Sequence, residues 1–199
     1  MKKTLTMVLA LVLVAAISVG ATLAYLTSQD SVTNTFTVGN VAITLDETDV
    51  DNSTANKDRD QANSYHLLPG HTYTKDPIVH VSAGSEDCYL FVKVTNQIAA
   101  IEDSSNTVAS QMAAKGWTVV DATKGIYVYT GTTGTTPLAV SANANVPVFE
   151  SFKVAGTVDN DTLDDYDGMT IVVNAYAIQA DGFENATPAD IWAAGFGNN

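Results

Sequence analysis

The strongest structural signal in this chain is the stretch Cys88-Tyr89-Leu90-Phe91-Val92-Lys93-Val94. Side chains of an extended strand point alternately to its two faces, so this stretch would carry two different surfaces. One face holds Cys88, Leu90, Val92 and Val94, and the other holds Tyr89, Phe91 and Lys93. The first face is wholly apolar, and we therefore expect a β-strand that contributes to a core.

Other segments with strand character lie on both sides of this strand. We expect strands at residues 32–38, 41–45, 78–81, 117–120, 126–129, 146–154 and 169–179. Helical patterns are sparse: one covers residues 108–115, and another begins at Thr187, with Pro188 in the first helical position and Asp190 completing a capping box. Many short strands with one or two short helices predict an all-β fold, a jelly-roll-like antiparallel β-sandwich.

Composition narrows the possible functions. The chain has 199 residues, 46% of them hydrophobic, and a formal net charge of −13. A surface this acidic repels phosphate, so nucleic acids are not expected partners, and anionic membranes are disfavoured for the same reason. Cys88 is the only cysteine. Stability must therefore come from packing, because no internal disulfide can form.

The first residues have the layout of a secretory signal peptide. Lys2 and Lys3 precede an uncharged apolar run over residues 5–19, and small residues follow up to Ala24. We expect cleavage between Ala24 and Tyr25, which divides the chain into a signal-peptide helix at 1–24 and a single secreted domain at 25–199. The alternative is an uncleaved anchor, because residues 5–26 are about long enough to span a bilayer.

Catalytic motifs are weak. The three histidines, His66, His71 and His80, lack the Glu of a His-Glu-x-x-His helix, although they could meet across the Pro69-Gly70 turn and bind zinc. The simpler interpretation is three solvent-facing residues near a turn. Cys88 alternates with apolar residues and is expected in the core rather than as a nucleophile.

Two acidic stretches are candidates for cation binding. Residues 159–168 contain five carboxylates and residues 46–60 contain six, and calcium prefers such oxygen ligands. Neither stretch has the spacing of the twelve-residue calcium loop, so solvated acidic turns are the favoured interpretation. No cofactor is predicted.

The most specific pattern follows the expected cleavage site. Residues 24–28 and 34–41, with the later Leu68-Pro69-Gly70 turn and the closing residues 177–183, resemble the TasA/camelysin family of exported Gram-positive proteins. One residue and one short segment depart from the family pattern. Leu26 replaces the usual Phe, and residues 80–84 replace a common Asn-x-Gly turn.

This resemblance implies a function in the extracellular matrix. A SipW-type signal peptidase would release a jelly-roll subunit that polymerises with itself into biofilm fibres, with or without an accessory matrix protein. The freed segment 25–38 would add as a donor strand to the next subunit, with Val32, Phe36 and Val38 as buried anchors. The alternative is that residues 32–38 form the first strand of their own domain.

Two further functions are compatible with the sequence. Camelysins have been labelled metalloendopeptidases, a label that would require zinc ligands and a general base. A monomeric cell-surface module is the other possibility, with Trp117, Tyr127, Tyr129 and Phe149 as a face for stacking carbohydrate.

Overall fold

The computed structural model describes residues 3–12, 39–53 and 58–197. The chain divides into two units, Met1–Val38 and Gly39–Asn199. In the first unit residues 3–12 are helical, and the rest of the expected signal peptide and the whole segment 25–38 lie outside the described residues. Within the described ranges no helix has the length and apolar character needed to cross a membrane.

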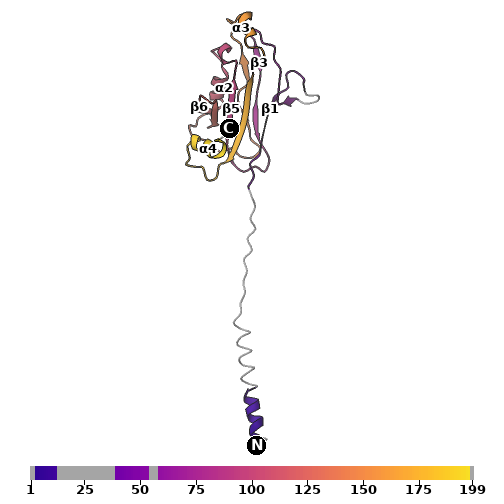
Figure 1. Cartoon of the computed structure of the whole chain (residues 1–199), viewed down its shortest axis with the longest axis vertical. Coiled ribbons are helices and arrows are strands. Elements are labelled where there is room, and N and C mark those ends of the chain that lie inside the picture. Colours follow the sequence, from indigo (N-terminus) through magenta and orange to yellow (C-terminus); the bar gives the residue numbers. More distant parts are fainter. Residues whose placement is uncertain (1–2, 13–38, 54–57, 198–199) are drawn as a thin grey trace. The chain divides into compact units, whose positions relative to one another are not determined.

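The second unit is built mainly from two antiparallel four-stranded sheets (Figure 1). The first sheet has the order β2 (Arg59–Asp60), β1 (Ile43–Thr48), β4 (Ile78–Val81), β8 (Asn145–Pro147). The second has the order β10 (Ile171–Gln179), β5 (Cys88–Asn96), β7 (Ile126–Tyr129), β6 (Trp117–Asp121). A separate pair joins β3 (Thr72–Thr74) to β9 (Ser151–Lys153). The predicted predominance of antiparallel β-structure is confirmed.

Strand β5 lies in the second sheet and separates two apolar clusters. Cys88, Leu90, Val92 and Val94 belong to the larger cluster, which also contains buried residues of β4 and β8 and so joins the two sheets. Tyr89 and Phe91 belong to the smaller cluster on the opposite face. The alternation predicted from the sequence is therefore confirmed, because each face of β5 supplies a different core.

Helix α4 (Pro188–Phe196) covers the smaller cluster. Trp192 and Phe196 contact Phe91, with ring centroids 5.6 and 6.0 Å away, and both also contact Tyr176 of β10. The helix begins as predicted, because the Thr187 side chain accepts a hydrogen bond from the Asp190 backbone N–H. The aromatic contacts fix this helix against the second sheet.

The predicted pair of strands at 117–120 and 126–129 is also confirmed as β6 and β7. The turn between them ends at Gly125, whose φ is +66° and whose added Cβ would lie 2.1 Å from the Val94 carbonyl oxygen. Only glycine fits this close approach, which lets the Gly125 carbonyl accept a hydrogen bond from Val94 N–H. Before β6 the chain also forms the short helix α2 (Val108–Ala114) and a 3₁₀ turn at Ala99–Ile101.

Two segments differ from the sequence-based expectation. The single strand expected at 146–154 is divided into β8 and β9, because Val148 and Phe149 are fully buried while the chain crosses from β4 to β3. The acidic residues 159–168, expected as a turn, include the short helix α3 (Asn160–Asp164), capped by the Asp159 side chain. The described part of the second unit thus has a third short helix besides α2 and α4.

Candidate functional site

Strand β10 has an open edge. It pairs with β5 over all nine of its residues, and in the described part of the chain no strand pairs with its other edge. Thr170 and Ala180, just outside the strand, form backbone hydrogen bonds with the β5 side at 3.0 and 2.8 Å. Antiparallel pairs alternate, so even-numbered residues bond to β5 and the odd-numbered ones direct N–H and C=O groups to the open edge.

Strand β1 lies beside β10 (Figure 1) and is also incompletely paired. Residues 43–46 pair with β4, and β2 covers the other edge only at Glu47 and Thr48. A side-chain bond from Gln61 Nε2 to the Leu45 carbonyl oxygen, at 3.3 Å, caps part of that edge. Two incompletely paired strands from different sheets therefore flank the same opening.

A groove of about 990 Å³ lies at this opening, bordered by residues 45–47 of β1 and 171–173 of β10. Its lining comes from β1, β10, the segment 61–67 and the residues around α3. Much of the lining is apolar and includes Leu45, Tyr65, Leu67, Ile98, Phe152, Leu163, Met169, Ile171 and Val173. The Tyr65 and Phe152 rings meet edge to face with centroids 5.1 Å apart. The size and apolar lining suit an extended peptide segment better than a small ion.

A buried ion pair also lines the groove. Lys75 Nζ lies 2.7 Å from Glu47 Oε2, and their side chains are only 12% and 6% exposed. Asn63 donates a further bond to Glu47 at 3.1 Å. The neighbouring Tyr65 hydroxyl donates to the Thr74 carbonyl, and burial together with the Glu47 charge raises the Tyr65 pKa, so this phenol stays neutral.

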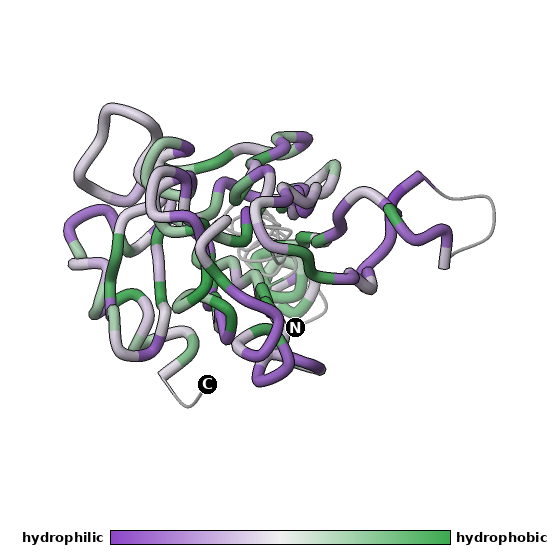
Figure 2. Tube along the Cα trace, turned by 90° about the horizontal axis from the view of Figure 1, so that it is seen from above, coloured by the Kyte–Doolittle hydropathy of each residue, from purple (hydrophilic) through white to green (hydrophobic). Residues whose placement is uncertain are grey.

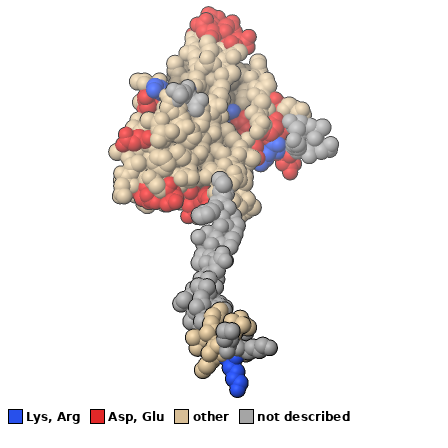
Figure 3. Space-filling view, turned by 60° about the horizontal axis from the view of Figure 1, so that its bottom comes forward, with Lys and Arg blue, Asp and Glu red and all other residues tan. Residues whose placement is uncertain are grey.

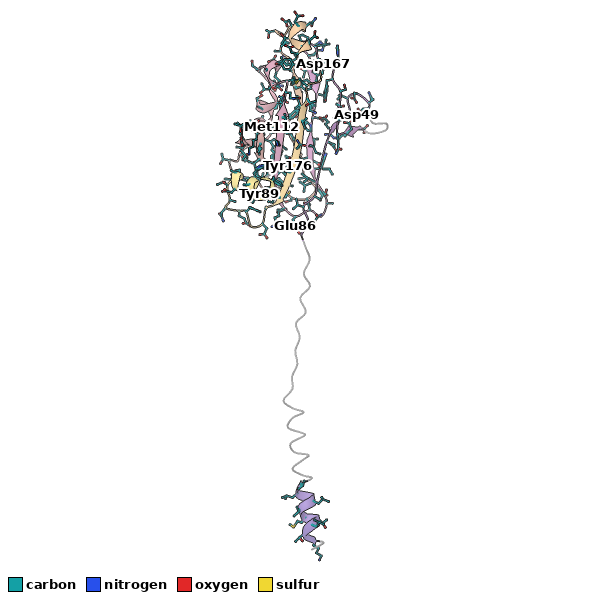
Figure 4. All side chains as sticks on the ribbon, in the orientation of Figure 1. Asp49, Glu86, Tyr89, Met112, Asp167 and Tyr176 are labelled. Carbon is teal, nitrogen blue, oxygen red and sulfur yellow. The ribbon has the colours of Figure 1, made fainter. Side chains whose placement is uncertain are left out.

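The groove has an acidic end. Asp164 and Asp167 line it beside α3, and Figure 3 shows carboxylates gathered at the end of the unit that carries this helix. The chain enters the unit at the opposite end, where Glu86 N–H donates to the Asn40 carbonyl at 2.9 Å. Figure 4 labels Asp167 and Glu86 at these two ends. The Asp167 end and the Glu86 end therefore give the unit a direction, and the groove lies toward the Asp167 end.

Arg59 links the first sheet to the loop after β3. Its Nε contacts Asp46 Oδ1 at 2.5 Å, and its Nη1 contacts Asp76 Oδ2 at 3.0 Å. Burial opposes ionisation of both carboxyls. Hydrogen bonds outweigh that effect and lower both pKa values: Arg59 and His80 bond to Asp46, and Thr48 and Arg59 bond to Asp76. This network supports β1 behind the groove.

The three histidines do not come together as a zinc site. His80 occupies β4, with Nε2 at 3.0 Å from Asp46 Oδ1 and Nδ1 at 2.6 Å from Asn145 Oδ1. His66 and His71 flank the turn at Gly70, and the His66 carbonyl accepts a bond from the Tyr73 hydroxyl. Among the residues that the structure describes, no set of possible metal ligands contains a histidine.

One cluster of three carboxylates could hold a hard cation. Oxygens of Asp49, Asp51 and Asp60 lie within 4.8 Å of one another in the acidic loop. Ser53 bridges all three, because its N–H donates to Asp49 and Asp51 and its hydroxyl donates to Asp60. Figure 2 shows this hydrophilic loop projecting from the body of the unit. Local hydrogen bonds through Ser53 hold these carboxylates close together.

The remaining candidates lie in the core. Cys88 is fully buried, and burial with the nearby Asp87 raises its pKa to about 11, so it is a protonated thiol rather than a nucleophile. Trp117 and Phe149 are 2% and 0% exposed, so they cannot form an open stacking face with Tyr127 and Tyr129.

The residues predicted around the cleavage site and as strand anchors lie outside the described residues: Ala24, Tyr25, Val32, Phe36 and Val38.

Comparisons with protein-family models, curated proteins and solved structures found no match to this chain. The candidate site therefore rests on geometry. Sequence patterns indicated the strand at 169–179, but nothing in them indicated that one edge of this strand would stay open beside an apolar groove. An open edge depends on strand order, which is a property of the whole sheet.

Proposed function

We propose that this protein is a secreted structural subunit of extracellular matrix fibres, a jelly-roll sandwich of the TasA/camelysin type. A SipW-type peptidase removes the signal peptide after Ala24, and residues 25–38 of one copy then add as a strand to another copy. The subunit acts by assembly.

The observation that supports this proposal best is the open edge of β10 beside the apolar groove. A nine-residue strand with an unpaired edge is a template for another strand, and natural proteins usually cover or charge such edges. Here Ile171 and Val173 line the groove instead. An incoming segment would satisfy the free backbone groups, each hydrogen bond adding about 0.5–1.5 kcal/mol.

The segment 25–38 has the side chains that such a groove accepts. Val32, Phe36 and Val38 fall on one face of an extended strand, and Thr33, Thr35 and Thr37 fall on the other. Burial of one large apolar side chain contributes about 1.5–3 kcal/mol, so the three anchors supply much of the docking energy. Attachment of the signal peptide would hold this segment at the membrane, so its removal acts as the trigger for assembly.

The test is the substitution Phe36→Asp. A carboxylate in an apolar groove is strongly unfavourable unless it is neutralised, so we expect the exported protein to stay monomeric. The matched control is Thr37→Asp, which adds the same charge to the opposite face and should still give fibres. Electron microscopy of the secreted protein reads out both variants, and N-terminal sequencing confirms that each begins at Tyr25.

Normal fibres from Phe36→Asp would contradict the proposal. A Phe36→Asp protein that unfolds as a monomer would contradict it too, because the segment would then belong to its own core. Thermal unfolding of the two variants separates these results, since a donated segment leaves the melting temperature of the subunit unchanged.

A further inference from the structure

We infer that the donated strand pairs antiparallel with β10, and that it therefore comes only from another copy of the chain. This inference rests on the proposed function and adds the direction of the inserted strand. In this arrangement Val38 of the donor lies at the Asp167 end of the acceptor, and the donor N-terminus points to the Glu86 end.

The direction of β10 is fixed by its neighbours. It begins at Ile171, four residues after Asp167, and ends at Gln179. Ala180 then donates to the carbonyl of Asp87, next to Glu86. The strand thus runs from the Asp167 end of the unit to the Glu86 end (Figure 4).

The pairing in this unit favours an antiparallel addition. Every strand pair in the described residues is antiparallel. Antiparallel hydrogen bonds lie perpendicular to the strands and are slightly more stable per residue than parallel ones. Odd-numbered residues of β10 from Ile171 to Gln179 present the N–H and C=O groups with which an added strand would pair, so the preference for the antiparallel direction rests on the pattern of pairing in the sheets.

An antiparallel strand cannot come from the same molecule. Val38 precedes Asn40 by two residues, or about 7 Å of chain, and Asn40 is bonded to Glu86. The opposite end of β10 is about 30 Å away along nine residues. A segment docked through Phe36 and Val38 in its own subunit would therefore run from the Asp167 end to the Glu86 end, parallel to β10. Antiparallel pairing requires the Asp167 end of a second copy.

Cysteine cross-linking tests the direction. One full-length variant carries Thr37→Cys and Val172→Cys, and the other carries Val38→Cys and Gln179→Cys, so that the two cysteines of each variant lie on the same face of the sheet. Val172 and Gln179 are both exposed, near opposite ends of β10, and the native Cys88 is fully buried. Each variant is exported and processed by the producing cell and treated with a short bifunctional thiol reagent. Denaturing gels and electron microscopy are then run on the same sample, with the four single substitutions as controls.

The expected result is a ladder of covalent dimers, trimers and longer species from the Val172 pair, and only background cross-linking from the Gln179 pair. A ladder from the Gln179 pair alone, in samples that form fibres, would overturn the inferred direction and leave strand donation standing. A cross-linked monomer from the Gln179 pair would show self-insertion and overturn the inference. Absence of fibres in the unsubstituted protein would instead overturn the proposed function.

Discussion

Glu47 and Lys75 place a buried ion pair in the wall of the groove, and their burial makes the site sensitive to the loss of either partner. The two charges neutralise each other: Lys75 donates to both carboxylate oxygens of Glu47, and Asn63 donates an additional hydrogen bond to one of them. Removal of one partner leaves the other charge buried without compensation, which costs more than the pair itself contributes. Single substitutions here should therefore destabilise the wall of the groove.

Lys75→Met should lower the free energy of unfolding by about 3–5 kcal/mol, because it leaves the Glu47 carboxylate unpaired in a site where it is 6% exposed. The double variant Lys75→Met/Glu47→Leu should recover most of that loss. Urea denaturation at pH 7 measures both. A single variant that loses less than about 1 kcal/mol would mean that water reaches Glu47.

At the scale of elements, the two-residue strand β2 is too short to hold itself in the sheet. Arg59 fixes it through Asp46 and Asp76, and it also donates to the backbone carbonyls of both residues. This one side chain therefore connects β2, β1 and the loop that precedes β4. Because Asp46 and Asp76 are ionisable, the contribution of these contacts to the stability of the subunit also depends on pH.

Arg59→Gln should reduce stability by about 1–2 kcal/mol at pH 7, an estimate discounted for partial exposure. In the parent the Asp46 and Asp76 pKa values are lowered, so their contribution is present above the unfolded value near 3.8 and is lost as pH falls through the folded values. The difference between parent and variant should therefore shrink below about pH 4. Denaturation curves at pH 7 and pH 3 test this, and an unchanged difference would refute it.

At the scale of the whole molecule, the open edge of β10 separates the stability of the subunit from its assembly. Backbone groups that face β5 hold the sheet together, whereas those of odd-numbered residues face the opening. Substitutions at neighbouring residues of β10 should thus have different effects: one position should affect assembly and the next should affect the stability of the subunit. Proline distinguishes them, because it removes one backbone donor at a chosen position.

Ala175→Pro removes a donor on the open edge and should abolish fibres while the subunit stays folded, since proline is tolerated on edge strands. The matched control Asn174→Pro removes a bond to β5 and should lower the melting temperature of the subunit markedly. Circular dichroism and electron microscopy are the measurements. Fibres formed by a folded Ala175→Pro protein would show that this edge takes no part in assembly.

Local patterns in the sequence were sufficient for several elements. The alternation at 88–94 predicted both faces of β5, and the Thr187 cap predicted the start of α4. These features depend on residues close together in the chain, and their geometry follows from the strand and helix periods. The same alternation placed Cys88 in the core, which the structure confirms.

Only the tertiary structure decided which edges stay open and which side chains meet. The segment 146–154 has a continuous strand pattern, yet Val148 and Phe149 enter the core and divide it. His80 lies beside Asp46, 34 residues away in the chain, rather than with the other histidines. The groove likewise forms because β1 and β10, which lie near opposite ends of the second unit's sequence, belong to different sheets that share one core.

The physical reason is the range of the interactions. A strand's alternation is written into neighbouring residues, whereas its partners are chosen by the packing energy of the entire sheet. Residues 171–179 would have the same pattern in a central strand or at an edge, and only the order of the four strands leaves one side of β10 unpaired.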